Sequence, residues 1–380
     1  MQRELFSYVE KKEEEYINFL QDICSYEATA IEKEELDKMV DYIEKFALSK
    51  GLNVKRTPFE KCGDFLTIDI NEGAEKGNMF LAHMDTVHEK GSFGYPCVRI
   101  EGGRMIAPGT VDCKGGIAIA LLTMEALKEC GYKKHTRLIL TSDEEVSNVL
   151  GGEKEQRFFC ESVKGFKSAI NCETARGDEV AVSRIGIMRR KIAITGKGGH
   201  SGIDYFNASS AILEAAHKIV HLEANSELGK ATYNCSIING GSVANCIPDQ
   251  CSFIVDIRAA NREDMDKAEK NVKEITETSY VPGTSAVITE ISTRIPMIRN
   301  ADTELLFEQM QMVSKKYGLG ELTAIESGGG ADSAYTQAAG VPTLCGLGGS
   351  GDFFHTNKEY IDLDCIVKRA KLLSAFCLEF

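Results

Sequence analysis

The sequence predicts an α/β protein that carries a second, smaller α+β domain inserted into it. Short buried strands alternate with helical segments near both ends of the chain, as in α/β folds. The middle of the chain changes to longer strands in which apolar and polar residues alternate. The length of 380 residues also favours two domains over one small core.

The first part of the chain begins with helices and continues with buried strands. Residues 4–24 and 33–50 carry apolar side chains at helical spacing, and Gly51 is typical of a helix C-cap. The strands expected next are Phe65–Ile70, Asn78–Ala82, Arg137–Ser142 and Ser168–Asn171. Gly102-Gly103 indicates a hairpin, and 117–127 is an apolar stretch that predicts a buried helix.

Residues 183–297 are expected to form the inserted domain, and 1–182 with 298–380 the other domain. The order strand, helix, strand, strand, helix, strand is that of the split ferredoxin-like unit. Its elements are Gly186–Thr195, 207–221, Tyr233–Asn239, Ser252–Ala259, Arg262–Thr276 and Ala286–Ser292. The α/β pattern then returns with a helix at 301–317, a strand at 341–345 and a helix at 362–377.

Charge and cysteine content restrict the possible partners and compartment. The net charge is −13 and basic residues are scattered among acids, so we expect no nucleic-acid partner. The 13 cysteines include no C-x-x-C pair, which indicates free thiols and a reducing cytoplasm. The longest apolar run, 117–122, is too short to span a bilayer, and the charged N-terminus does not resemble a signal peptide, so we expect no membrane association.

Histidines and acids follow several of the expected strands. In open α/β sheets, ligand-binding side chains gather at the carboxyl ends of strands. Imidazole and carboxylate are the ligands that zinc, manganese or cobalt take when thiolate is absent, and two such ions can activate a water. The sequence therefore predicts a pair of divalent ions, with one glutamate left to act as a base. The residues concerned are His83, Asp85, Asp112, Glu144, Glu145, Glu173 and His355.

Spacing gives some of these residues different roles. His83 and Asp85 point to one face of an extended segment, so Asp85 can orient the imidazole. Three consecutive acids at 143–145 repel one another, and bound cations remove that cost. Adjacent residues face opposite ways, so one of Glu144 and Glu145 can bind metal while the other faces the substrate. Each motif alone also has a structural interpretation, such as a turn aspartate or a surface histidine.

Eight segments, in the same order along the chain, resemble the M20 family of metallopeptidases, most closely its glutamate carboxypeptidase-like branch. They extend from residue 82 to residue 355, and a chance match of all eight is implausible. The segments are AHMDTVHEKG (82–91), RIEGGRMIAPGTVDCKGG (99–116), TSDEE (141–145), NCETA (171–175), GKGGHSG (196–202), NCIPDQCSFIVDIR (245–258), GGGADSAY (328–335) and GDFFH (351–355).

The resemblance implies a metallopeptidase domain that holds two divalent ions, with zinc expected and cobalt or manganese as alternatives. Asp112 would bridge the two ions. His83 and Glu173 would bind one of them, and Glu145 and His355 the other.

The resemblance also assigns residues around the ions. Glu144 would be the general base and Asp85 the residue that orients His83. The peptide bond Asp112–Cys113 would be cis. Cys113 departs from many relatives, which often carry Met there, while His88 and Cys97 match no ligand position and are expected to be non-ligands.

For the inserted domain, the resemblance implies a lid that also makes a homodimer. His200 would enter the active site of the partner and stabilise an oxyanion. Asn245 and Arg258 would hold the terminal carboxylate of the substrate, and an arginine fork suits that contact. Gly329 and Gly330 would let the substrate backbone approach closely.

The expected activity is hydrolysis of an amide beside a carboxylate, in a small peptide or an N-acyl amino acid. A carboxypeptidase that releases a glutamate-type residue is the first hypothesis. An N-acyl-amino-acid deacylase would use the same catalytic residues, and a di- or tripeptidase is disfavoured because no acidic anchor for an α-amine is recognised. A catalytically silent scaffold is disfavoured because all the key residues are present.

Overall fold

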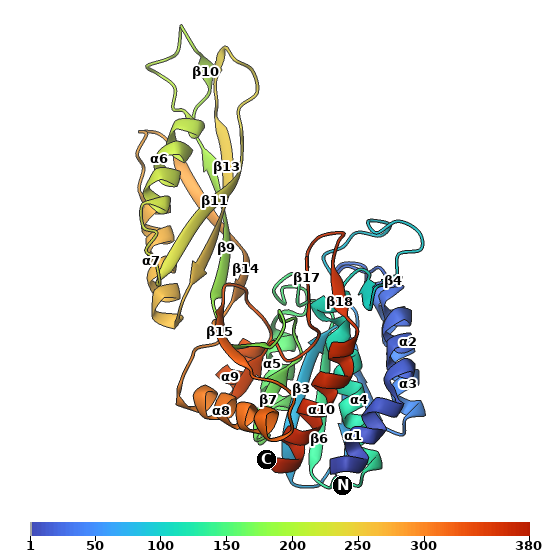
Figure 1. Ribbon diagram of the computed structural model, residues 1–380. Helices are drawn as coiled ribbons and strands as arrows, with labels where there is room; N and C mark the ends of the chain where they lie inside the picture. Colours follow the sequence, from blue (N-terminus) through green and yellow to red (C-terminus); the bar gives the residue numbers. More distant parts are fainter. Residues whose placement is uncertain (1) are drawn as a thin grey trace. The chain divides into compact units, whose positions relative to one another are not determined.

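The computed structural model describes residues 2–380, which form two compact units. The first comprises the chain up to Ser183 together with Arg299–Ser327 and Ala331–Phe380. The second comprises Arg184–Ile298 with Gly328–Gly330. The mixed α/β architecture predicted from the sequence is confirmed (Figure 1). Each unit is described separately below.

The first unit is built on a mixed sheet of eight strands in the order β1-β2-β6-β3-β7-β16-β8-β15. Its central strands are parallel: β3 pairs with β6 and with β7, and β7 with β16. Their carboxyl ends therefore meet at one edge of the sheet. The strands are β1 (Asn53–Thr57), β2 (Phe65–Ile70), β3 (Lys76–His83), β6 (His135–Thr141), β7 (Ser168–Asn171), β8 (Glu179–Arg184), β15 (Thr323–Ser327) and β16 (Thr343–Cys345).

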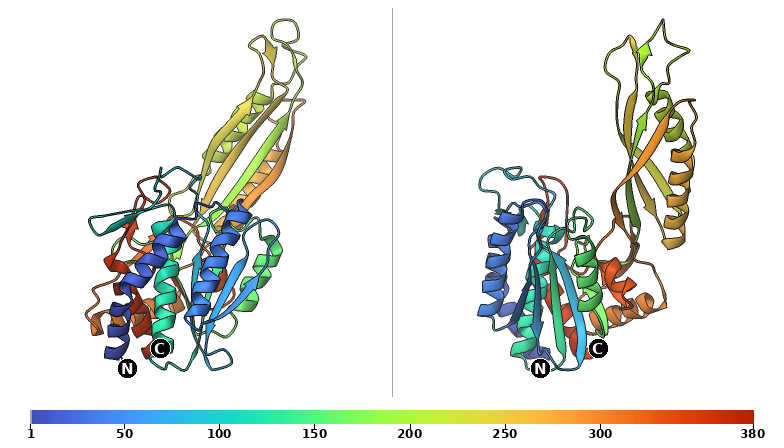
Figure 2. Two further views of the ribbon diagram at one scale, coloured as in Figure 1. Left: turned by 90° about the vertical axis from the view of Figure 1, so that its right-hand side faces the viewer. Right: turned by 180° about the vertical axis from the view of Figure 1, so that it is seen from behind.

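Helices cover both faces of this sheet (Figure 2). The larger core contains residues of α1 (Gln2–Lys11), α2 (Glu13–Cys24), α3 (Lys33–Ser49), α4 (Gly115–Glu129), α8 (Ala301–Lys316) and α10 (Asp364–Glu379). A smaller core on the other face contains residues of α5 (Gly152–Ser162) and α9 (Ser333–Ala338). Helix α4 lies deepest, as its apolar sequence predicts, and nearly all of it is buried.

Some features of this unit differ from the prediction. The stretch with helical spacing at 4–24 forms two helices, because a turn at Lys12 separates α1 from α2. Apolar residues at helical spacing continue across the turn, because each of the two helices buries an apolar face. The exposed edge strand β1 and the polar helix α5 were not expected, because neither carries a clear apolar period.

The first unit also contains a small antiparallel sheet. Its strands, in the order β17-β18-β5-β4, are β17 (Gly351–Asp352), β18 (Tyr360–Asp362), β5 (Arg104–Ile106) and β4 (Arg99–Glu101). The predicted hairpin at Gly102-Gly103 joins β4 to β5, and both glycines have positive φ angles. In this sheet Arg104–Ile106 pairs with Tyr360–Asp362, although the two strands are far apart in the chain.

The second unit contains a four-stranded antiparallel sheet with two helices on one face (Figure 1). The sheet order is β11-β13-β9-β14, and its elements follow the chain order predicted above. They are β9 (Gly186–Thr195), α6 (Ala211–Glu223), β11 (Ala231–Gly240), β13 (Gln250–Ala259), α7 (Arg262–Glu277) and β14 (Ser285–Arg294). Helix α6 begins later than expected because Ser210 caps it, accepting a hydrogen bond from the Leu213 amide at 3.2 Å.

None of the helices in the described chain is both long and apolar enough to cross a membrane.

Candidate metal centre

The predicted metal ligands of the first unit converge at the carboxyl edge of its sheet. His83 is the last residue of β3. Glu145 lies in the turn that follows β6, and Glu173 follows β7. Asp112 lies in the loop that leads into α4, and His355 follows β17. Five separate segments therefore supply one cluster.

Asp112 lies between the two histidines. Its Oδ1 atom is 3.3 Å from Nε2 of His83, and its Oδ2 atom is 3.4 Å from Nε2 of His355. Each histidine thus faces a different oxygen of one carboxylate. This is the arrangement expected of a carboxylate that bridges two ions.

A second carboxylate accompanies each histidine. Nε2 of His83 lies 3.5 Å from Oε1 of Glu173, and Nε2 of His355 lies 3.3 Å from Oε2 of Glu145. Potential ligand atoms of His83, Asp112 and Glu145 all lie within 4.8 Å of one another. The five residues therefore form two histidine–carboxylate groups that share Asp112.

The electrostatics of the cluster favour bound cations. Burial, together with the charges of Asp112 and Glu144, raises the pKa of Glu145 to about 8. Hydrogen bonds to Asp112 and Glu145 raise the pKa of His355 to about 11. Burial alone would raise the pKa of Asp112, but the two histidines lower it well below its ordinary value. The carboxylates thus attract positive charge to this site.

A buried oxygen atom of Glu145 indicates that a metal ion fits this site. Oε1 of Glu145 has no hydrogen-bond partner within residues 2–380. A buried carboxylate oxygen without a partner costs free energy, and a cation removes that cost. Imidazole and carboxylate donors, together with this oxygen, suit a divalent ion such as zinc.

Asp85 connects the ligand His83 to the turn that carries Glu144 and Glu145. Its carboxylate accepts the backbone N–H of Glu144 at 3.2 Å and that of Glu145 at 3.0 Å. Oδ1 of Asp85 also lies 3.4 Å from Nδ1 of His83. Asp85 is fully buried, so these contacts are shielded from water. Nδ1 of His83 also lies 3.1 Å from the backbone carbonyl oxygen of Asp85, so this residue contacts the imidazole through both its backbone and its side chain.

The loop that carries Asp112 depends on special backbone geometry. Gly109 has a φ of 68°, which favours glycine, and a Cβ there would lie 3.3 Å from the carbonyl oxygen of Asp112. The peptide bond between Asp112 and Cys113 is cis, as the resemblance implied. Buried Lys114 donates from Nζ to the carbonyl oxygens of Pro108 and Tyr26.

Glu359 was not recognised from the sequence, and it holds the same loop. Its Oε1 accepts the backbone N–H groups of Val111 at 2.9 Å and Asp112 at 3.2 Å. Its Oε2 lies 2.6 Å from Nε2 of His88. The predicted non-ligand His88 is therefore a partner of Glu359. The pair ties the segment after His83 to the loop of Asp112 and to the turn after His355.

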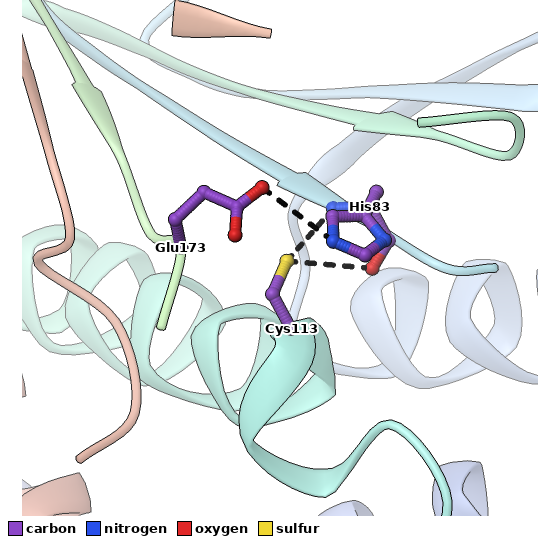
Figure 3. A group of neighbouring side chains, drawn as sticks. All are labelled: His83, Cys113 and Glu173. Carbon is purple, nitrogen blue, oxygen red and sulfur yellow. Dashed lines mark hydrogen bonds and ion pairs between the residues drawn. The ribbon is translucent and has the colours of Figure 1, made fainter. Parts of the chain in front are cut away.

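Cys113 lies beside His83 and Glu173 (Figure 3). Its Sγ accepts the backbone N–H of His83 at 3.1 Å and donates to the His83 carbonyl oxygen at 3.6 Å. Ligand atoms of the three residues lie within 4.8 Å of one another, and all three are buried. Cys97, which was predicted with His88 to be a non-ligand, belongs to neither metal-ligand group found among residues 2–380.

The remaining predicted site residues belong to the second unit. His200 lies in the short strand β10 (Gly199–His200), which pairs with β12 (Cys246–Ile247), and the carbonyl oxygen of Asn245 accepts the Ser201 N–H at 3.0 Å. Nδ1 of His200 accepts backbone N–H groups of Gly202 and Ile203.

Arg258 and the two glycines also have defined surroundings. Arg258 donates from Nε to Oδ1 of Asp256 at 2.5 Å, so its guanidinium already has an anionic partner. The carbonyl oxygen of Gly330 accepts from Arg184 at 3.4 Å, and a Cβ on Gly330 would approach Cδ of Arg294 to 2.7 Å. Gly329 lies between Gly328 and Gly330, which belong to this unit.

Comparisons with known proteins identify the family of this chain. The model of "Peptidase family M20/M25/M40" matches residues 79–379. Carboxypeptidase G2 from Pseudomonas sp. (strain RS-16) is 26% identical over 385 residues, which cover 99% of this chain and 91% of the relative. Succinyl-diaminopimelate desuccinylase from Rickettsia akari (strain Hartford) is 26% identical over 288 residues, covering 68% and 73%.

A solved structure shares the fold. The structure of aminopeptidase PepT from Bacillus cereus ATCC 10987 matches with a TM-score of 0.76 and 21% identity, covering 97% of this chain and 98% of the other. The matched family is metal-dependent, and this chain has a cluster of potential metal ligands. The chain therefore belongs to peptidase family M20/M25/M40 and is a hydrolase of that family.

Proposed function

We propose that this protein is a two-metal carboxypeptidase that releases a C-terminal glutamate or a similar residue from small peptides. The observation that carries the proposal is the placement of Asp112 between His83 and His355. The similarity to carboxypeptidase G2 over nearly the whole chain favours this activity within the family.

His83 and Glu173 would hold one ion, and Glu145 and His355 the other, with Asp112 shared. We expect zinc, with cobalt or manganese as alternatives, because the donors are imidazole and carboxylate. When bound, the ions supply Lewis-acid activation of a water and positive charge for the developing oxyanion. The remaining chemistry falls to residues of the chain.

Glu144 is proposed as the general base. It lies in the turn after β6, which ends at Thr141, and it precedes the proposed ligand Glu145; its backbone N–H donates to Asp85. A carboxylate there would take a proton from the attacking water and return it to the leaving amine. General acid–base catalysis of this kind contributes about 10²–10⁴-fold to the rate.

His200 is proposed to act in the active site of a second copy of the chain. The N–H groups of Gly202 and Ile203 require Nδ1 of His200 to be an acceptor. In the neutral imidazole the proton is then on Nε2, which can donate to an oxyanion. His200 is exposed and therefore accessible to a partner.

A homodimer through the second unit would bring His200 to that site. Strand β11 is an edge strand of its sheet, and exposed Ile237 and Ile238 lie on it. An exposed apolar edge strand is a natural pairing surface. A reducing cytoplasm is proposed because all 13 cysteines are free thiols.

Arg258 and Asn245 are proposed to hold the α-carboxylate of the substrate, with Gly329 and Gly330 leaving room for its backbone. Because Arg258 is paired with Asp256, a substrate carboxylate would have to share or displace that contact. Arg258→Ala should raise KM at least tenfold for substrates with a free α-carboxylate, since a charge-assisted pair contributes roughly 1.5–3 kcal/mol. Kinetics with the matched α-carboxamide substrates is the control, since these lack the group that Arg258 would bind.

A deacylase acting on N-acyl amino acids is the second candidate. The similarity to succinyl-diaminopimelate desuccinylase favours it, and the same catalytic residues would serve. A di- or tripeptidase is a weaker candidate, because the likeness to aminopeptidase PepT concerns the fold.

A paired substrate panel separates these activities. N-blocked dipeptides ending in Glu, Asp, Ala or Leu would be compared with N-acetyl and N-succinyl amino acids and with free tripeptides. Each substrate would be tested with zinc, cobalt or manganese and after chelation. Chelator-sensitive release of the C-terminal residue from blocked dipeptides is the expected result. Preference for the N-acyl amino acids would contradict the carboxypeptidase proposal and establish the deacylase, and cleavage of free tripeptides alone would establish the peptidase.

A further inference from the structure

We propose that Cys113 supplies a thiolate ligand to the ion held by His83 and Glu173. This inference rests on the metal centre proposed above and adds a sulfur donor to one of its two positions. The observation that carries it is the buried group formed by the sulfur, an imidazole nitrogen and a carboxylate oxygen, all within 4.8 Å of one another (Figure 3).

The backbone prepares the sulfur of Cys113 for this role. The N–H of His83 points at Sγ, at 3.1 Å. Hydrogen bonds from backbone N–H groups to sulfur are typical of metal-bound thiolates, because they stabilise the negative charge. The neighbouring thiol of Cys172 differs, since it donates weakly to the Ile170 carbonyl oxygen at 3.9 Å.

Metal binding would displace a proton from the thiol of Cys113. The S–H bond of Cys113 breaks, its proton leaves to solvent, and a sulfur–metal bond forms. The weak donation from Sγ to the carbonyl oxygen of His83, at 3.6 Å, is lost in that step. The hydrogen bond from the His83 N–H to the sulfur is retained.

A sulfur ligand would make the two metal positions unequal. The position of His83 and Glu173 would have nitrogen, oxygen and sulfur donors, and the position of His355 and Glu145 only nitrogen and oxygen. Thiolate favours zinc and disfavours harder ions such as manganese and magnesium. We therefore expect the first position to be selective for zinc and the second to accept a wider range of divalent ions.

X-ray absorption spectroscopy at the zinc edge tests the ligand directly on the full-length protein loaded with zinc. A sulfur ligand lies at about 2.3 Å from zinc, against roughly 2.0–2.1 Å for nitrogen. One sulfur per two zinc ions is the expected result. The cobalt-loaded protein should show a sulfur-to-cobalt charge-transfer band in the near ultraviolet.

Cys113→Ser should abolish both signals, and Cys172→Ser is the matched control that should keep them. Two bound ions per chain with only nitrogen and oxygen ligands would overturn the role of Cys113 and leave the proposed enzyme intact. A sulfur signal that persists in Cys113→Ser would also overturn it. Failure of the wild-type chain to bind metal at all would count against the metal centre itself. The wild-type spectrum alone can overturn the proposal, so that outcome does not depend on the folding of a variant.

Discussion

The Oδ1 atom of Asp85 accepts a hydrogen bond from the backbone amide of Glu144, 3.2 Å away. The same carboxylate lies 3.4 Å from Nδ1 of His83. One buried residue therefore contacts both the imidazole of a proposed metal ligand and the backbone of the proposed base. This contact connects the binding of metal with the placement of the group that moves the proton.

Asp85→Asn should weaken metal binding about 10–100-fold, because partners of metal-bound histidines have effects of that size. The amide would also lose charge and one of the two acceptor oxygens that hold the turn. Competition with a chromophoric chelator measures the affinity.

Asp69→Asn is a matched control for Asp85→Asn, because Oδ1 of buried Asp69 lies 2.7 Å from Nε2 of His135 outside the metal centre. That variant should lower stability but leave the metal affinity of the folded protein unchanged. Equal affinities for Asp85→Asn and wild type would contradict the orienting role.

Glu359→Ala should weaken metal binding as well as stability. It leaves the N–H groups of Val111 and Asp112 buried without acceptors, and each such group costs about 1–3 kcal/mol. Glu359→Gln retains one acceptor oxygen and should restore most of the metal affinity. If both variants lose stability alone and bind metal like wild type, Glu359 does not position Asp112.

Metal should stabilise the fold, because it neutralises carboxylates that repel one another in its absence. A ligand present at 100 times its Kd stabilises a protein by about 2.7 kcal/mol per site. Adding zinc to the chelator-treated protein should therefore raise Tm measurably, and His355→Ala should reduce the increase. His217→Ala is the control, because that exposed histidine stacks on Tyr280 in the second unit. An unchanged Tm on zinc addition would argue against the centre.

We expect buried Glu155 to make the stability of the fold decrease as the pH rises. Burial, with the nearby charges of Asp143 and Asp332, raises the pKa of Glu155 to about 11. Between the ordinary value of 4.5 and about 11 the folded state binds one more proton than the unfolded state, so this group lowers stability as pH rises.

In wild type, Nδ2 of Asn148 donates to Oε1 of Glu155 at 2.6 Å. Glu155→Gln keeps an acceptor oxygen for this bond and removes the group that must bind a proton in the folded state. Its free energy of unfolding should exceed that of wild type at pH 8 by roughly 1 kcal/mol or more, since one pKa unit corresponds to 1.36 kcal/mol. The difference should vanish near pH 4. Urea unfolding at both values checks this, and a gain that does not change with pH would contradict it.

The strand-end positions of His83, Glu145 and Glu173 were predictable, because apolar strands identify the edge of the sheet where ligands gather. Asp112 and His355 lie in loops, so only their motifs identified them. Glu359 could not be found, because its partners Val111 and Asp112 lie about 250 residues earlier and no local pattern marks the contact.

Local sequence patterns also failed to predict a strand in which polar and charged residues take the place of regularly spaced apolar ones. Strand β1 has no buried residue, so no apolar alternation marks it. The pairing of Arg258 with Asp256, in contrast, is a contact that a local sequence pattern could have identified. The two residues are two positions apart on one strand, so their side chains point to the same face. Spacing alone could therefore have predicted that the guanidinium has a partner.

Glu144 is proposed to move the proton while other residues hold the metal. The most direct measurement is the turnover and metal content of Glu144→Gln, with the best substrate of the panel. We predict that the variant binds two ions per chain like wild type and that kcat falls about 10²–10⁴-fold, the contribution of a general base. Turnover near that of wild type, with the metal content unchanged, would contradict the account.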